Sequence, residues 1–267
     1  MPTELGICHI CLRHAKLSYE HVPPRRAYNR LPVVAHTLNH PAAAAKKIPF
    51  GMALKYRAGM GVTTLCEKCN GATGAAYSGA FAEWVRQALQ YAERYEQVNG
   101  SENQILLPFT IEPLAVLKQI ATMILAVAQI SGNDAMGHLR RFVSIPFEPW
   151  TAHNVSVRVY LNPKRAGWRE PQNRMNGASV MMNVKTGQST NTLADIAFPP
   201  LGYWAAWTDV PQRPLAEFRD LVDITHFGKY PWRRMATVWL QMPVKLPVGP
   251  VAFHKQYQQP NRVTTSS

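Results

Sequence analysis

Two pairs of cysteines constrain this chain more than any other feature of its sequence. Cys8 and Cys11 form one C-x-x-C pair, Cys66 and Cys69 form another, and the 267 residues contain 4 cysteines in all. A C-x-x-C turn presents two thiolates, so two such turns complete a tetrahedral site for one zinc ion. Four thiolates leave no position for water or substrate, and the predicted zinc is therefore structural.

Two disulfide bonds are the competing explanation of the same four cysteines. Disulfides belong to oxidising compartments, and the N-terminus lacks the basic flank and apolar core of a secretory signal. We therefore expect a cytoplasmic protein and favour zinc. The most apolar long stretch, residues 111–130, includes Glu112 and Lys118, which favours a buried helix over a membrane span.

The charge of the chain favours an anionic partner. The formal net charge is +13 and the pI is about 9.8, a balance that suits nucleic acid better than a small metabolite. Both halves are basic, with 12 Lys and Arg against 6 Asp and Glu in residues 1–100, and 17 against 10 in residues 101–267. Either half can therefore contact a polyanion, and no oligomeric state is indicated.

The spacing of apolar residues predicts helices in the middle of the chain. Apolar side chains recur at three- and four-residue intervals between Tyr77 and Tyr95, which is typical of an amphipathic helix. A second helix is expected from Thr110 as N-cap to about Ser131, and a shorter one over residues 134–142. The stretch 36–49 between the cysteine pairs is rich in Pro and Ala and favours a loop.

Alternating, β-branched segments predict strands after residue 150. They cover residues 155–161, 179–184, 192–198, 202–208 and 235–242, with a turn at 185–187 and a short helix near 215–222. The predicted fold is α+β: a zinc-stapled N-terminal module, then helices and a mainly β C-terminal domain. We expect the first domain to span residues 1–98 and the second, of undetermined role, to span residues 99–267.

A short motif lies between the two cysteine pairs. Glu20-His21-Val22-Pro23 follows Cys11, and Asn70 directly follows Cys69. In this setting residues 8–75 resemble the HNH endonuclease family, whose ββα-metal fold is often framed by two C-x-x-C knuckles. The match is closest to the branch that reads C-x-x-C, then E-H-hydrophobic-x-P, then C-x-x-C-N.

The resemblance implies a role for each residue of the motif. His21 falls on the family's general base, which takes a proton from the water that attacks a phosphodiester. Glu20 and Asn70 fall on ligands of a catalytic divalent metal, and two oxygen donors suit Mg²⁺ or Mn²⁺. Asn70 has an ordinary alternative role as a cap of the helix that follows.

One position of the family is not matched. An Asn that usually precedes the second knuckle, and holds the loop carrying the base, has no counterpart in residues 59–65. The candidates for this role are Thr63, Thr64, Asn29 and Asn39.

Three arginines follow the expected base: Arg25, Arg26 and Arg30. They are candidates for phosphate contacts, although a solvated basic turn is an equally ordinary reading. The resemblance thus implies a metal-dependent nuclease, with DNA favoured over RNA as its substrate. The alternatives are a non-catalytic zinc module that binds nucleic acid and, less favoured, a module that binds an acidic protein.

Overall fold

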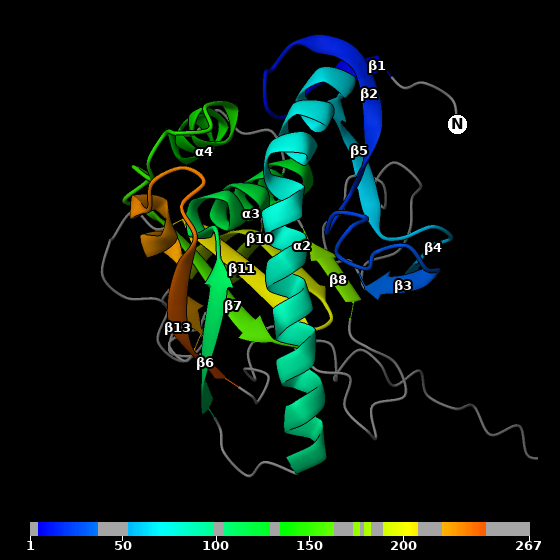
Figure 1. The fold of residues 1–267 in the computed structure, drawn as a ribbon. Coiled ribbons are helices and arrows are strands. Elements are labelled where there is room, and N and C mark those ends of the chain that lie inside the picture. Colours follow the sequence, from blue (N-terminus) through cyan, green and yellow to red (C-terminus); the bar gives the residue numbers. More distant parts are fainter. Residues whose placement is uncertain are drawn as a thin grey trace, which may run out of the picture.

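The fold combines helices and several antiparallel sheets. The computed structural model describes residues 5–36, 53–98, 104–128, 134–162, 173–176, 179–182, 189–207 and 221–243. Its most prominent element is the long helix α2 (Glu67–Val98), which runs in front of the large sheet in Figure 1.

The cysteine pairs lie at the ends of a small antiparallel sheet. It contains β1 (Leu5–Ile7), β2 (His14–His21) and β5 (Gly61–Cys66), with β2 in the centre. The pairing of β2 with β5 sets Leu17 opposite Cys66 and His21 opposite Gly61. Because α2 begins directly after β5, two antiparallel strands lead straight into a helix (Figure 1).

The segment between the cysteine pairs contributes two strands that the sequence did not suggest. β3 (Val33–His36) and β4 (Ala53–Tyr56) pair with each other, and β3 also runs parallel to β8 (Asn173–Asn176). Residues 37–52, which include most of the expected loop, lie outside the described ranges. The N-terminal segment therefore adds its strands to a sheet built mainly from the C-terminal half.

That larger sheet lies behind α2 in Figure 1. Its order is β12 (Val222–Asp223), β7 (Val155–Leu161), β11 (Leu201–Trp207), β10 (Ser189–Phe198), β8, β3, β4, and β9 (Ser179–Met182) pairs with β10. The expected strands at 155–161, 179–184, 192–198 and 202–208 are confirmed within the residues described. The expected turn at 185–187 lies outside them, as does most of the expected helix at 215–222, whose last residue begins β12 instead.

Helix α3 (Pro113–Val127) forms the centre of the core, with all of its residues buried. It contacts α2, α4 (Asp134–Ser144), the 3₁₀ helix η2 (Thr225–Lys229) and strands β5 and β10. No helix in the described ranges combines the length and apolar character needed to cross a membrane.

The charge inside α3 is accommodated by backbone groups. The Nζ atom of Lys118 donates to the carbonyl oxygens of Phe142, Ile145 and Glu148, the last two at 2.9 Å. These carbonyls lie at the C-terminal end of α4 and just beyond it, where the helix dipole favours a cation. Lys118 therefore fastens α4 to α3, which explains a lysine in the most apolar stretch of the chain.

The expected start of the second helix is wrong. Thr110 does not cap it but lies in β6 (Gln104–Ile111), which pairs with β13 (Ala236–Pro243) as a separate two-stranded sheet. The N-cap of α3 is Glu112. Local sequence does not reveal β6, because its partner strand is more than 100 residues away.

One hydrophobic core crosses the boundary expected after residue 98. Leu65 from β5, Trp84 from α2, Ile124 from α3 and Val157 from β7 all belong to it. Described residues on both sides of residue 98 therefore contribute to one hydrophobic core.

Candidate functional site

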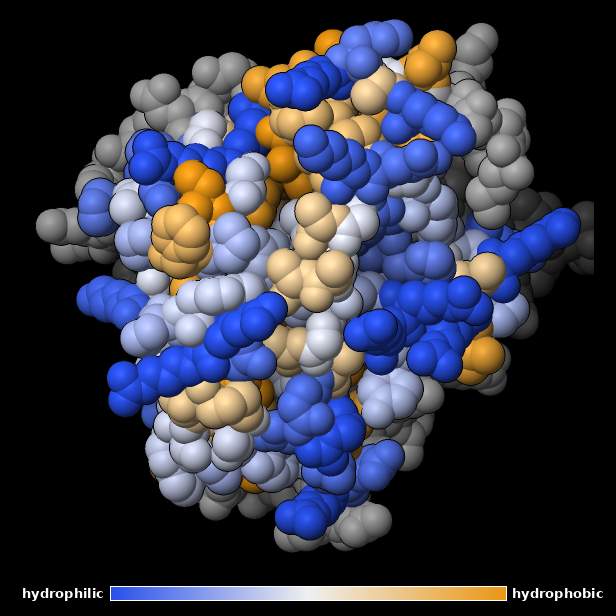
Figure 2. Space-filling model, turned by 45° about the horizontal axis from the view of Figure 1, so that its top comes forward, coloured by the Kyte–Doolittle hydropathy of each residue, from blue (hydrophilic) through white to orange (hydrophobic). Residues whose placement is uncertain are grey.

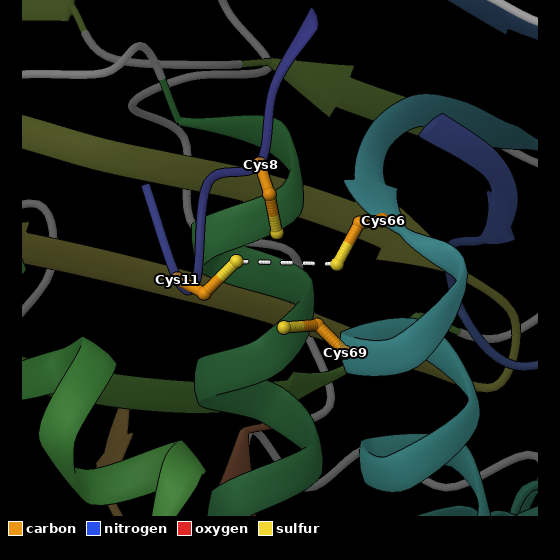
Figure 3. Close-up of side chains that lie close together, drawn as sticks. All are labelled: Cys8, Cys11, Cys66 and Cys69. Carbon is orange, nitrogen blue, oxygen red and sulfur yellow. Dashed lines mark hydrogen bonds between the residues drawn. The ribbon is translucent and has the colours of Figure 1, made fainter. Parts of the chain in front are cut away.

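The four cysteines come together at one end of α2. Cys8 and Cys11 lie on the turn between β1 and β2, while Cys66 ends β5 and Cys69 lies in the first turn of α2. Their sulfur atoms point toward one another (Figure 3) and all lie within 4.8 Å of one another. This is the one group of three or more His, Cys, Asp or Glu side chains in the described ranges that could hold a metal ion.

The geometry of the cluster fits a zinc ion rather than disulfides. All four cysteines are free, and the sulfur atoms of Cys11 and Cys66 are 3.9 Å apart. A Zn–S bond of about 2.3 Å in a tetrahedron implies sulfur pairs about 3.8 Å apart, whereas a disulfide needs about 2.05 Å. The cysteines can therefore bind a zinc ion with little rearrangement.

The backbone around Cys8 favours its thiolate. Burial acts to raise the pKa of Cys8, but backbone N–H groups of Cys66, Cys11 and Ile10 donate to the sulfur and lower the pKa to about 7. Burial raises the pKa of Cys69, as do the neighbouring sulfur groups. A bound cation offsets this mutual repulsion, since thiolates and not thiols are the metal ligands.

The cysteine cluster is anchored to the central helix α3. The ring of His9 donates from Nδ1 to the carbonyl oxygen of Leu125 at 2.8 Å, and the hydroxyl of Thr64 donates to the carbonyl oxygen of Ala126 at 2.7 Å. Arg140 of α4 donates to the carbonyl oxygen of His9 at 2.9 Å. The last carbonyls of a helix have no partners within it, and here residues beside the cysteines supply the donors.

Glu20 is buried at the end of β2. It is 7% exposed, and burial raises the pKa of its carboxyl group to about 8. No ion pair or hydrogen bond to this carboxyl group occurs among the described residues. A buried carboxyl group without a cationic partner is costly to ionise, and a bound divalent cation would remove that cost.

His21 lies at the surface beside Glu20, with one ring nitrogen engaged. Its Nε2 atom is 3.0 Å from the carbonyl oxygen of Ala58. Since a carbonyl oxygen only accepts, Nε2 carries the hydrogen, and the neutral ring has its lone pair on Nδ1. Tyr19 packs edge-on against the ring, with centroids 5.0 Å apart, and its hydroxyl donates to the carbonyl oxygen of Gly59. The ring is therefore held in one orientation by two neighbours.

Asn70 joins the first turn of α2 to β2. Its Nδ2 atom donates to the hydroxyl of Ser18 at 3.0 Å and to the carbonyl oxygen of Tyr19 at 3.2 Å. Both amide hydrogens are thus used, and no donor to Oδ1 occurs among the described residues. Asn70 therefore lies against the two residues of β2 that precede Glu20.

Asn29 joins the two segments that flank His21. It is one of the four candidates for the residue that holds the loop carrying the base. It is fully buried and donates from Nδ2 to the carbonyl oxygens of Pro23 and Met60, while Oδ1 accepts from the Met60 N–H. All three distances are 2.7 Å. Thr64 is engaged with α3 instead, and Asn39 lies outside the described residues.

The three candidate phosphate-binding arginines lie on the turn after His21. Arg25, Arg26 and Arg30 are all exposed, and the Arg30 side chain donates to the carbonyl oxygen of Arg25 at 3.3 Å. Two further exposed cations, Lys55 and Arg57, lie on the segment before β5, which Asn29 holds against this turn. No sequence motif marks Lys55 and Arg57 as candidates for phosphate contacts. They become candidates because the structure joins their segment to the turn after His21.

Comparison with known proteins finds no counterpart. No family model matches the chain, and no curated protein or solved structure matches it significantly.

Proposed function

We propose that this chain is a metal-dependent nuclease that hydrolyses phosphodiester bonds, with DNA as the expected substrate and His21 as general base. The observation that carries the proposal is the hydrogen bond from His21 Nε2 to the carbonyl oxygen of Ala58, at 3.0 Å. It fixes the tautomer whose Nδ1 lone pair can accept a proton. A histidine oriented in this way is suited to general-base catalysis.

In this proposal Nδ1 of His21 takes a proton from the water that attacks the phosphorus atom. The bond from oxygen to phosphorus forms as the bond to the leaving oxygen breaks, and the proton passes to the imidazole ring. The Ala58 carbonyl stabilises the resulting imidazolium through Nε2. A positioned general base contributes about 10² to 10⁴ in rate.

The ligands proposed for the catalytic cation are the carboxylate of Glu20 and the amide oxygen of Asn70. Both are hard oxygen donors, which Mg²⁺ and Mn²⁺ prefer, and both lack a donor or cation among the described residues. When bound, such a cation supplies electrostatic stabilisation of the charge that develops on the phosphate and the leaving oxygen. The buried position of Glu20 keeps water from competing for its carboxylate.

The zinc proposed for the four cysteines has a structural role. Four thiolates leave it no open position, so it takes no part in hydrolysis. It would fasten the turn between β1 and β2 to the junction of β5 and α2. The proposed catalytic residues lie on these same elements, and the zinc thus keeps β2 and the first turn of α2 together.

The alternative is a zinc module that binds nucleic acid without cutting it. The net charge of +13 and the exposed arginines beside His21 support binding in either case. The deciding experiment is incubation of the full chain with supercoiled plasmid, with Mg²⁺, with Mn²⁺ and without added divalent cation. The proposal predicts nicked or linear product in the presence of the cations. Retarded but uncut plasmid under every condition would instead establish the binding module.

A further inference from the structure

The turn between β2 and β3 holds Tyr28 in a left-handed backbone conformation. Its φ is 66°, and its side chain is 51% exposed. Bulky residues rarely adopt this conformation, because the side chain crowds the backbone. Such a conformation persists where the surrounding structure imposes it, and it occurs often at functional sites.

The residues on either side of Tyr28 impose this conformation. Ala27 and Asn29 are both fully buried, and the Ala27 N–H donates to the carbonyl oxygen of Pro24 at 2.8 Å. The N–H of Arg30 donates to the carbonyl oxygen of Tyr28 at 2.9 Å. The backbone of Tyr28 is therefore fixed at both ends while its ring extends from the surface.

The turn that carries the exposed ring is basic. Residues 22–36 and 53–66 contain no Asp or Glu. The exposed cations that these two segments carry are Arg25, Arg26, Arg30, Lys55 and Arg57. Figure 2 shows a dense group of hydrophilic side chains on the right-hand side, where β3 and β4 lie in Figure 1.

Tyr28 is next in the chain to the residue that closes the loop around His21. Asn29, the next residue, binds both backbone groups of Met60. Met60 precedes Gly61, which pairs with His21, and the Met60 carbonyl oxygen also accepts from the N–H of Val22. Tyr28 is thus one residue from the contact that closes the loop around His21.

An exposed aromatic ring on a basic turn suits an unpaired nucleotide. Proteins that bind single strands stack bases on aromatic rings and contact the backbone through cations. Bases inside an intact duplex already stack on one another and offer no free face. We infer that Tyr28 is a stacking platform for an unpaired base next to the phosphate that is cut, with the flanking arginines on the adjoining phosphates.

This inference deepens the proposed function and rests on it. It names the substrate class as nucleic acid that has unpaired nucleotides at the cutting site. Because stacking needs no catalytic cation, it can be measured separately from cleavage.

The test measures binding of the full-length chain to a labelled oligothymidylate and to a blunt duplex of equal length. No Mg²⁺ or Mn²⁺ is added, so that neither is cut. Tyr28→Asn removes the ring while keeping a residue that tolerates a left-handed conformation, and Tyr28→Phe keeps the ring. Leu31→Ala is the matched control, because Leu31 is an exposed apolar residue of the same segment, at 71% exposure.

We expect Tyr28→Asn to weaken single-strand binding by roughly 5- to 150-fold, which corresponds to the loss of one stacked base. Duplex affinity and the thermal midpoint should stay close to those of the wild type. Tyr28→Phe and Leu31→Ala should bind the single strand like the wild type.

Two results would overturn the inference alone. Equal single-strand affinity of Tyr28→Asn and the wild type would show that no base stacks on the ring. An equal loss on single strand and duplex would mean that the substitution disturbs the surface as a whole. Neither result touches the proposed function if the wild type still cuts plasmid. A wild-type chain that binds no nucleic acid at all would overturn both the inference and the proposed function.

Discussion

The side chain of Asn29 binds both backbone groups of Met60, accepting from its N–H and donating to its carbonyl oxygen, each at 2.7 Å. A third hydrogen bond reaches the carbonyl oxygen of Pro23. The turn after β2 is thereby joined to the segment before β5, on the two sides of His21. The local sequence does not distinguish Asn29 from the other three candidates for this role, because its partner is 31 residues away.

Replacing Asn29 should therefore destabilise the fold and impair cleavage together. Asn29→Ala leaves the Met60 N–H and the Pro23 carbonyl oxygen without the partner that Asn29 supplies, and the Met60 carbonyl oxygen keeps only the Val22 N–H. This change costs about 2 to 4 kcal/mol of unfolding free energy. Asn29→Asp keeps the acceptor for the Met60 N–H but loses both donated bonds. Urea denaturation should rank wild type first among the three. Full stability of Asn29→Ala would contradict this assignment.

The burial of Glu20 predicts a pH dependence of stability. Its pKa is raised from 4.5 to about 8 in the folded chain, so the folded state favours the protonated form. The stabilising contribution is complete below pH 4.5 and is lost as the pH rises through 8. Without added Mg²⁺ or Mn²⁺, the loss should approach about 1.4 kcal/mol for each pH unit within that window.

The comparison of Glu20→Gln with the wild type isolates this effect. The variant cannot ionise, so its thermal midpoint relative to wild type should rise between pH 5 and pH 8. Glu67→Gln is the control, because Glu67 is exposed and paired with Lys16 at 3.0 Å. Parallel pH profiles of wild type and Glu20→Gln would contradict the predicted ionisation.

Mg²⁺ should reverse the loss at high pH if Glu20 is its ligand. The cation competes with the proton for the carboxylate, so its binding should strengthen with pH up to about 8. The rise in thermal midpoint on adding Mg²⁺ should be larger at pH 8 than at pH 6, and absent from Glu20→Gln. An equal rise in both proteins would place the cation elsewhere.

Zinc removal should loosen the core helix as well as the N-terminal sheet. We expect about one zinc per chain by elemental analysis. Because His9 and Thr64 supply donors to the carbonyls of Leu125 and Ala126, losing the knuckle structure removes these contacts. A chelator, or the substitution Cys66→Ser, should speed hydrogen exchange in the last turn of α3.

Thr64→Val tests the hydrogen bond to the Ala126 carbonyl oxygen independently of zinc binding. It removes one donor to α3 without touching a cysteine, so zinc content should stay unchanged while exchange at the end of α3 rises modestly. If zinc removal leaves exchange in α3 unaltered, the knuckle does not support this helix.

The parts of the fold that the sequence predicts are those with local signals. The spacing of the cysteine pairs is enough to predict their cluster, and the alternation of apolar residues is enough to predict β7. The start of α2 at Glu67 was missed because Gly71 and Gly74 interrupt the apolar periodicity before Tyr77. Strand β6 was missed because its partner, β13, is more than 100 residues away. Strand β3 pairs with the distant β8 as well as with the nearer β4.

The candidate site likewise has parts that local sequence predicts and parts that it does not. Glu20, His21 and Asn70 were identified from a motif, whereas the Ala58 carbonyl that fixes the His21 tautomer has no side chain to signal it. Lys118 was visible as a charge in an apolar stretch, but its three carbonyl partners depend on how α4 packs.

Replacement of His21 is the most direct test of its proposed role as the general base of a nuclease. Plasmid cleavage with Mg²⁺ or Mn²⁺ is compared between wild type, His21→Ala and His14→Ala. His14 is the control, because it is an exposed histidine at the other end of β2. We expect His21→Ala to lower the cleavage rate by about 10² to 10⁴, with zinc content, thermal midpoint and DNA affinity unchanged. His14→Ala should cut normally. Cleavage by His21→Ala at the wild-type rate would contradict the role of His21 as general base.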